Sequence, residues 1–445
     1  MSDMKVVKAS CIGPARTDNT GENCQKYYKE KSGLSLCEVL SEERDSDHPD
    51  FFRIRTSADN GKSWGEWQNA PVPAYRRYGS YEVLCADGFS HATDWVWNPV
   101  HGHSVRLSQE QVYRNGHEKA LSERFDDRDA WSLHTYLFIR DDDGREAVQL
   151  IRYEDGADFD PGAPGNAAYF HRNAAYRCNN IVIDKNGDLL LALGIPMRKC
   201  FELRGEDNRY LYPTEPDIDI YNGVIMVRGH WNGKTYAFTP SRPMVISDLL
   251  TGRGMDEPTI ALLSSGRIVI VTRGSNMVPH RHAGNRLEPG TPGFKWYAFS
   301  DDGGKTFTDF MPWHFDSGEV IYSSATISQF FRGERNGKQY WIGNIIPPEA
   351  AHTIHENYPR FPLNIVEIDE TYGTAKKDTL TVIDTRRDGE SEYVQLSNFC
   401  TYQDRETGYL HVILTKFGQH YPAESVYKCE IWEYEIELDE GGNNL

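Results

Sequence analysis

Two series of glycine-containing turns run along the chain and constrain its fold more than any other feature. The first series places glycines about 70 to 90 residues apart, at positions 61, 144, 233, 303 and 373. The second series has glycines at 187, 266, 337 and 408, with weaker earlier members at 21 and 102. Each turn of the second series precedes a turn of the first by about 40 residues, so every period is expected to hold two β-hairpins.

Short β-rich segments lie between these turns and are bounded by Gly, Asn or Asp. They comprise residues 51–56, 180–183, 189–193, 267–272, 295–300, 339–345, 364–368, 409–414 and 430–438. Four strands per period predict an all-β fold, a six-bladed β-propeller of four-stranded antiparallel blades whose first and last strands complete one blade. A β-sandwich or two stacked all-β domains is the alternative. No linker divides residues 1–445, so a single domain is expected.

The composition excludes several classes of protein. A formal net charge of −18 argues against nucleic-acid and anionic-membrane binding, and no apolar run approaches the roughly 20 residues of a membrane helix. The 8 cysteines form no CxxC pair, and neither a metal nor a cofactor is expected. The first residues lack an apolar signal core, which indicates a cytoplasmic protein; a trimmed secreted or periplasmic chain is the alternative. A homo-oligomer is compatible with the sequence.

Two octapeptides share the pattern Ser-x-Asp-x-Gly-x-[Ser/Thr]-[Trp/Phe], the Asp-box. They run from Ser57 to Trp64 and from Ser300 to Phe307, and residues 140–144 look like a decayed third copy. In such a hairpin the Asp side chain caps backbone amides of the turn, and the glycine adopts a positive φ. Asp59 and Asp302 are therefore interpreted as structural residues of the rim, not as catalytic acids.

With these repeats the sequence resembles the sialidase superfamily of Asp-box (BNR-repeat) six-bladed propellers, as a divergent member. The similarity is sharpest in residues 253–273, where a strand, a Ser-Gly turn and a returning strand separate Glu257 from Arg273. The resemblance implies that Glu257 is the catalytic glutamate and Arg273 a substrate-binding arginine. On one hairpin, the two side chains are expected to meet at the same inner end.

Residues 320–324 (Val-Ile-Tyr-Ser-Ser) are similar to the element that supplies the nucleophilic tyrosine of sialidases, and Tyr322 occupies the matched position. A phenol has an ordinary pKa of about 10 and needs a base to attack a sugar. A carboxylate such as Glu257 can accept its proton. The alternative interpretations are an ordinary aromatic residue at a strand end for Tyr322 and a structural, arginine-paired carboxylate for Glu257.

The arginines that bind the substrate carboxylate in sialidases are matched only in part. Arg16, in the segment Gly-Pro-Ala-Arg-Thr-Asp, is the best candidate for the arginine of the first blade. Arg253 and Arg360 are further candidates, because guanidinium groups bind carboxylates through two parallel hydrogen bonds. Arg360 lies in a loop that is expected to overhang the substrate.

Two histidine pairs suggest further chemistry. His101 and His103 are expected in a substrate-side loop of the second blade, where Asp94 is the carboxylate alternative for the general acid. His280 and His282 form a second pair that is expected to contact substrate if the two loops converge. Histidine titrates near working pH and can act as an acid or a base. A hydrogen-bonded loop histidine is the structural alternative for either pair.

Three functions are compatible with these residues. The first is a sialidase-like, exo-acting glycoside hydrolase that removes a terminal, acidic sugar from a carbohydrate substrate. The second is a polysaccharide lyase acting on uronic acids, which the histidine pairs favour. The third is a glycan-binding propeller without catalysis, since one fold hosts many functions.

Overall fold

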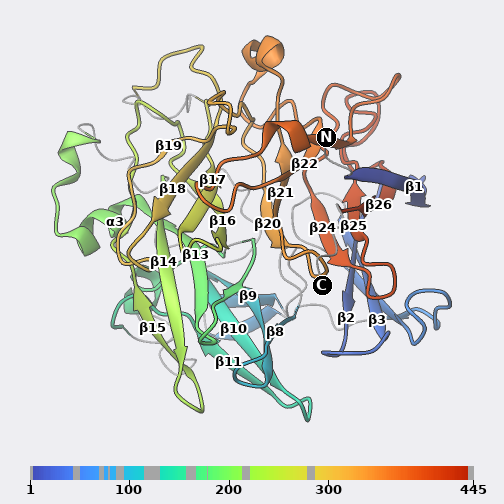
Figure 1. Cartoon of the computed structure of the whole chain (residues 1–445), viewed down its shortest axis with the longest axis horizontal. Helices are drawn as coiled ribbons and strands as arrows, with labels where there is room; N and C mark the ends of the chain where they lie inside the picture. Colours follow the sequence, from blue (N-terminus) through green and yellow to red (C-terminus); the bar gives the residue numbers. More distant parts are fainter. Residues whose placement is uncertain are drawn as a thin grey trace.

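The computed structural model describes residues 4–43, 51–69, 75–78, 81–86, 95–114, 131–156, 167–177, 179–212, 221–277 and 286–438. Their strands form six sheets, which are arranged in a ring (Figure 1). Among the described residues no helix is long and apolar enough to cross a membrane. The fold is therefore the predicted all-β, six-bladed propeller.

The strands follow one another blade by blade along the chain. The first three blades contain β2 (Gly21–Tyr28), β3 (Leu36–Glu43), β4 (Phe51–Ser57) and β5 (Gln68–Asn69); β6 (Tyr75–Tyr78), β7 (Tyr81–Ala86), β8 (Val96–Asn98), β9 (His103–Arg114), β10 (Trp131–Asp141) and β11 (Glu146–Leu150); and β12 (Val182–Ile183), β13 (Leu189–Pro196), β14 (Asn222–Trp231) and β15 (Tyr236–Pro240). The last three contain β16 (Asp256–Leu262), β17 (Ile268–Arg273), β18 (Lys295–Ser300) and β19 (Met311–Pro312); β20 (Gln329–Arg332), β21 (Gln339–Asn344), β22 (Leu363–Glu367) and β23 (Thr381–Asp384); and β24 (Phe399–Gln403), β25 (Leu410–Thr415), β26 (Ile431–Glu437) and β1 (Lys5–Gly13). The helical elements are α2 (Ala167–His171), α3 (Met197–Arg204) and the 3-10 helices η1 (Asn208–Tyr210), η3 (Pro348–Thr353) and η4 (Lys377–Thr379).

The ring is closed by strands from both ends of the chain. β1 pairs antiparallel with β26, from Lys5 opposite Glu437 to Gly13 opposite Ile431. Figure 1 shows the blue β1 beside the red β26. The prediction that the first and last strands complete one blade is confirmed.

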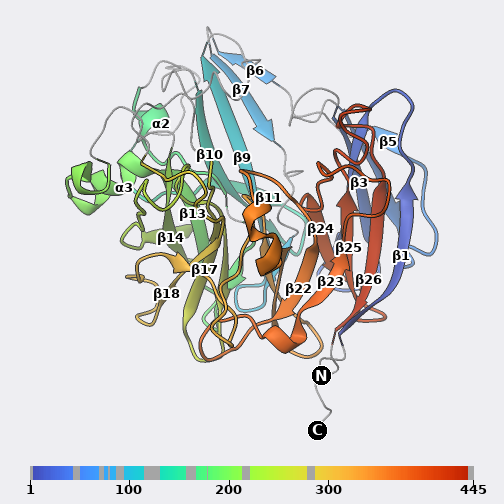
Figure 2. The same cartoon turned by 90° about the horizontal axis from the view of Figure 1, so that it is seen from above.

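The second blade departs from the four-strand plan. β8, β9, β10 and β11 form its regular part, while β7 pairs with the far half of β9, residues Gln109 to Arg114, and β6 pairs with β7. This extension carries β6 and β7 beyond the neighbouring blades (Figure 2).

Both series of turns fall where the spacing predicts. Turns of the first series join the third and fourth strands of the first five blades, and turns of the second series join the first and second strands. Gly21 is the exception, because it is the first residue of β2. Gly33, with a φ of 91°, lies in the corresponding turn of the first blade.

Both octapeptide hairpins have the hydrogen bonds that their pattern predicts. Asp302 accepts hydrogen bonds from the backbone N–H of Thr306 at 3.0 Å and from its hydroxyl at 2.6 Å, and Asp59 accepts the equivalent pair from Ser63 at 2.8 and 2.6 Å. In the third copy Asp141, not a residue at the Asp-box position, caps the turn by accepting from Arg145 N at 2.9 Å. These aspartates hold rim turns.

Apolar side chains pack between neighbouring blades. Leu107, Leu191 and Ile270 belong to one buried cluster that joins the second, third and fourth blades. The clusters between the fourth, fifth and sixth blades follow the same pattern. Between the sixth and first blades the apolar cluster is smaller, and a buried ion pair, Lys26 Nζ to Glu433 Oε2 at 2.7 Å, adds to it.

The antiparallel strands give the ring two different faces. We call the face that carries both series of hairpin turns the turn face. The opposite face, which we call the loop face, carries the connections from second to third strands and from blade to blade. The first strands start at the loop face, the second strands end there and the third strands start there.

Candidate active site on the loop face

Glu257 lies at the loop-face start of β16, the first strand of the fourth blade. A register shift between Asp256 and Thr259 interrupts the pairing of β16 with β17. At this irregularity Glu257 has a φ of 44°, a left-handed conformation that is uncommon for residues other than glycine. Such strained positions concentrate at functional sites. Asn179 helps to fix the backbone here, since its side chain donates to Glu257 O at 3.2 Å and to Ser328 O at 3.0 Å.

Arg273 ends the returning strand β17 and lies directly opposite Asp256 in the ladder. Its Nη1 is 3.0 Å from Glu257 Oε2, and its Nη2 is 3.2 Å from Asp256 Oδ2. Glu257 Oε2 receives no hydrogen bond from the described residues, so its contact with Nη1 is an ion pair without a hydrogen bond. Nη1 instead donates to Ala325 O at 3.5 Å. The prediction that Glu257 and Arg273 meet at one end of a hairpin is confirmed.

Burial and neighbouring charges change the pKa values of Glu257 and Arg273. Burial raises the pKa of Glu257, Asp256 adds to the rise, and Arg273 opposes it. For Arg273, burial acts to lower the pKa, but Glu257 and Asp256 together outweigh it, so the pKa is raised. The arrangement thus combines a permanently charged arginine with a carboxylate whose proton is held more tightly than usual.

Lys295 starts β18 opposite Arg273 and is fully buried. Its ammonium group donates to the carbonyl of Thr326 and, at 3.3 Å, to the Thr326 hydroxyl. Burial lowers its pKa to about 7, and Arg273 lowers it further while Glu257 opposes. This lysine was not singled out in the sequence, although its strand was predicted with the bounds that β18 has.

Two further arginines add positive charge to the same region. Arg177, in the segment that leads into β12, is buried, and its Nε and Nη1 have no hydrogen-bond partner among the described residues. Arg253 precedes β16, and burial and then the charge of Arg273 lower its pKa. The pKa of Tyr176, next to Arg177, is raised by burial and then by Glu257. Arg177 and Tyr176 were missed in the sequence because they match no motif.

Tyr322 lies on the same face, in the connection between the fourth and fifth blades. Its backbone bridges to Phe294 and to Ile346, and its ring stacks on Phe294 with centroids 5.4 Å apart. The following residues carry the carbonyls of Ala325 and Thr326, which accept from Arg273 and Lys295. Among the described residues the Tyr322 hydroxyl has no hydrogen-bond partner, and no contact links it to Glu257.

Arg360 lies in the long loop between β21 and β22, on the loop face as expected. Its Nε donates to Asn357 O at 3.0 Å, and its Nη1 donates to Gln395 at 2.8 Å and to Ser397 at 3.3 Å. Its positive charge acts on both Glu257 and Lys295. Arg360 therefore belongs to the charged cluster, and the carbonyl of Asn357 and the side chains of Gln395 and Ser397 help to hold it there.

Arg16 belongs to a different cluster. It forms ion pairs with Asp18 at 2.7 Å and with Glu22 and Glu42 at 2.9 Å each, beside β2 and β3. The hydrogen bond from Arg16 is the largest cause of the lowered pKa of Asp18, about 2. These carboxylates already occupy the guanidinium, so the prediction that Arg16 joins Glu257 and Arg273 finds no support in its contacts.

The expected position of His101 and His103 is wrong. Both belong to the hairpin between β8 and β9, which is on the turn face. His103 Nε2 lies 2.7 Å from the hydroxyl of Tyr236, and Asn98 in the same hairpin donates to Gly187 O at 2.8 Å. Burial, with the charge of His101, lowers the pKa of His103. These histidines pack the second blade on the third. Asp94, His280 and His282 lie outside the described residues.

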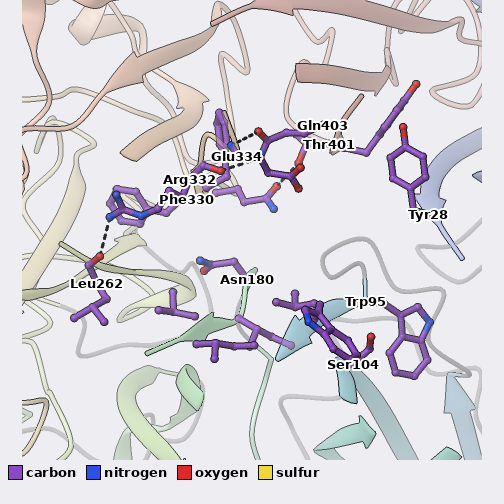
Figure 3. A pocket seen from close by; sticks show the side chains of 18 of the residues that line it. Tyr28, Trp95, Ser104, Asn180, Leu262, Phe330, Arg332, Glu334, Thr401 and Gln403 are labelled. Atoms are coloured by element: carbon purple, nitrogen blue, oxygen red, sulfur yellow. Dashed lines mark hydrogen bonds between the residues drawn. The ribbon is translucent and has the colours of Figure 1, made fainter. Parts of the chain in front are cut away.

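A cavity of about 710 Å³ occupies the axis of the ring at the turn face (Figure 3). All six blades contribute to its lining from their first strands and the residues next to them, for example at Asn180, Leu262, Phe330 and Thr401. None of the charged loop-face residues lines it. Within the described residues no three His, Cys, Asp or Glu side chains come together as a metal site.

Solved structures share the architecture of this chain. A protein of unknown function from Dyadobacter fermentans superimposes with a TM-score of 0.56 at 14% identity, covering 98% of this chain and 100% of the other. The NanB sialidase of Streptococcus pneumoniae gives a TM-score of 0.52 at 10% identity, with 98% and 70% covered. The chain has a sialidase-like propeller fold. A Trypanosoma rangeli sialidase agrees, with a TM-score of 0.50 at 11% identity and 97% and 59% covered.

At these identities the similarity establishes the fold alone. The sequence matches no protein-family model and no curated protein. The chemistry of this sialidase-like propeller therefore has to be argued from the loop-face cluster itself.

Proposed function

We propose that the protein is an exo-acting glycoside hydrolase that removes a terminal acidic sugar from a glycan. The observation that carries this proposal is the ion pair of Glu257 with Arg273, inside a cluster in which cations outnumber carboxylates. Such local positive charge, in a chain whose net charge is −18, favours an anionic ligand. A carboxylate with a raised pKa and a specific charged partner in this setting is typical of a catalytic group.

In the proposed mechanism Glu257 acts as the general base and Tyr322 as the nucleophile. Glu257 takes the proton of the phenol as the phenol oxygen attacks the anomeric carbon and the bond to the leaving oxygen breaks. Water then hydrolyses the resulting tyrosyl glycoside, which releases the sugar and returns the proton to Tyr322. A neutral tyrosine avoids the repulsion that a carboxylate nucleophile would exert on an anionic sugar. Asp94 remains the candidate for the acid that protonates the leaving oxygen.

The lyase hypothesis loses one of the two histidine pairs that favoured it. His101 and His103 lie on the turn face, away from Glu257. A lyase would still need a base beside a uronic acid. Tyr322 is a candidate for that role, and so are His280 and His282, which lie outside the described residues.

Product analysis tests the proposal. The protein is incubated with aryl glycosides of neuraminic and uronic acids and, as matched controls, with neutral glycosides of the same linkage. We expect release of the acidic sugar with addition of one water, detected by mass spectrometry. An unsaturated product that absorbs in the ultraviolet would instead identify a lyase. Saturable binding of an acidic sugar with no product after prolonged incubation would identify a binding protein.

A further inference from the structure

The side chain of Arg177 is buried, and two of its three nitrogens have no hydrogen-bond partner among the described residues. It is 5% exposed, and Nε and Nη1 donate a hydrogen bond to no oxygen among the described residues. An arginine remains protonated at every working pH, so it cannot relieve this situation by losing its charge. Buried polar groups are almost always satisfied, and a buried cation without a counter-ion is strongly unfavourable. Folding therefore places this cation where a ligand can pair with it.

The neighbours of Arg177 belong to the candidate site. Asn179, two residues along the chain, donates to Glu257 O, and its own N–H donates to Pro258 O at 3.0 Å. The preceding Tyr176 is influenced electrostatically by Arg177, Glu257 and Asp256 together. Arg177 thus stands beside the lead-in to β16, where the catalytic glutamate is proposed.

Unlike Arg177, Arg273 is paired with carboxylates of the protein. Its two terminal nitrogens face Glu257 and Asp256, at 3.0 and 3.2 Å, and Nη1 also donates to Ala325 O. A substrate carboxylate could engage this guanidinium only in competition with two protein carboxylates. Arg273 is therefore occupied by the protein.

Arg253 resembles Arg177 in having no ion pair or side-chain hydrogen bond among the described residues. The charge of Arg273 repels it, while Asp256, Glu257 and Glu356 attract it from a longer distance than an ion pair. It thus supplies a second unpaired guanidinium next to the Glu257–Arg273 pair. A planar two-oxygen anion is the group that guanidiniums bind best.

We infer that Arg177 and Arg253 bind the anionic group of the ligand. Arg273 is then a positioning residue, which holds Glu257 through their ion pair. The inference rests on the proposed function in taking that anionic group to be the carboxylate of an acidic sugar. It adds Arg177, which no sequence motif indicates, to the candidate Arg253, and it removes Arg273 from direct contact with the carboxylate.

Calorimetric titration of the full chain tests this assignment. The probes are inorganic sulfate, N-acetylneuraminic acid, glucuronic acid and, as the neutral comparison, galactose. Arg177→Met and Arg253→Met are each expected to weaken binding of sulfate and the acidic sugars by about tenfold or more, the range of a charged hydrogen bond. Arg273→Met is expected to retain sulfate binding within about threefold while turnover falls. Arg145→Met, an exposed turn-face arginine, is the control and should bind as the unmodified protein does.

Two further measurements keep the outcome decisive. Circular dichroism and thermal unfolding establish that each variant is folded. The variant Arg177→Lys keeps the positive charge but cannot donate two parallel hydrogen bonds. We expect it to bind sulfate with an affinity between those of the unmodified protein and Arg177→Met. Loss of anion binding in Arg273→Met with normal binding in Arg177→Met and Arg253→Met would overturn the inference, as would equal affinity for galactose. Arginine-dependent sulfate binding without any hydrolysis would remove the proposed function and leave the inference standing.

Discussion

Arg273 Nη1 lies 3.0 Å from Glu257 Oε2 at the loop-face end of the β16–β17 hairpin, with Asp256 3.2 Å from Nη2. One arginine therefore compensates two neighbouring carboxylates that are both largely buried. Because Asp256 and Glu257 are adjacent in sequence, the register shift in β16 is what lets both side chains reach the same guanidinium. The stability and the titration of the site follow from this triad.

Arg273→Gln is expected to destabilise the protein by about 3–5 kcal/mol, because it leaves buried carboxylates without their counter-ion. Urea unfolding at pH 7 measures the change. The double variant Glu257→Gln/Arg273→Gln should recover part of the loss, since one of the two uncompensated charges is then removed. A loss no larger than that of the exposed Arg145→Gln would contradict this account of the triad.

Asp256→Asn is expected to shift the acid limb of the pH–activity profile to lower pH. The limb reports ionisation of Glu257, whose pKa is raised by burial and then by the negative charge of Asp256. Activity requires the ionised base, so it falls as pH decreases through this pKa. Removing the Asp256 charge lowers the pKa and extends activity to more acidic pH. A profile that moves to higher pH would show that loss of the contact between Asp256 and Arg273 dominates instead.

Lys295 makes the stability depend on pH. Folding lowers its pKa from 10.5 to about 7, so below pH 7 the folded protein bears the full cost of a buried charge. As pH rises from 7 toward 10.5, the unfolded chain retains the proton longer, and the free energy of unfolding increases by up to about 1.4 kcal/mol per pH unit from this group. We expect Lys295→Met to remove this rise. Parallel pH profiles for the two proteins would rule out a buried lysine with a lowered pKa.

Asp302→Ala is expected to lower the thermal midpoint by a few degrees without changing kcat, because Asp302 caps a rim turn through Thr306 and Lys305. Asp301→Ala is the matched control, since the neighbouring Asp301 makes an exposed ion pair with Arg267 and should have a smaller effect. Differential scanning calorimetry measures both. Loss of activity in folded Asp302→Ala would show that the rim turn communicates with the loop face.

The fold could be predicted because its signals are local and periodic. A turn glycine such as Gly303 or Gly266 marks a hairpin wherever it lies, and the interval between such glycines gives the repeat length. The same logic would have placed His103 correctly, since Gly102 belongs to the series that joins first and second strands. The prediction that His103 lies in a substrate-side loop was based on the chemistry of histidine and did not take into account the position of Gly102 in the repeat.

Part of the site was predictable for the same reason. Glu257 and Arg273 lie on one hairpin, so their meeting depends only on local register. Arg177 and Lys295 depend on packing between blades and across a third strand, which no spacing in the sequence reveals. For Arg16 the sequence predicted a substrate-binding role, but folding brings three carboxylates to its guanidinium, and the sequence spacing does not reveal these ion pairs.

Steady-state kinetics of Glu257→Gln on an acidic aryl glycoside that the unmodified protein hydrolyses tests the central claim most directly, with Tyr322→Phe measured beside it. The glutamine keeps the shape of the side chain but cannot accept the phenolic proton. The account predicts that kcat/KM falls by roughly 10²–10⁴-fold in the Glu257 variant, the usual contribution of a general base, while the variant still binds the product sugar. Unchanged turnover in a folded Glu257→Gln protein would contradict it.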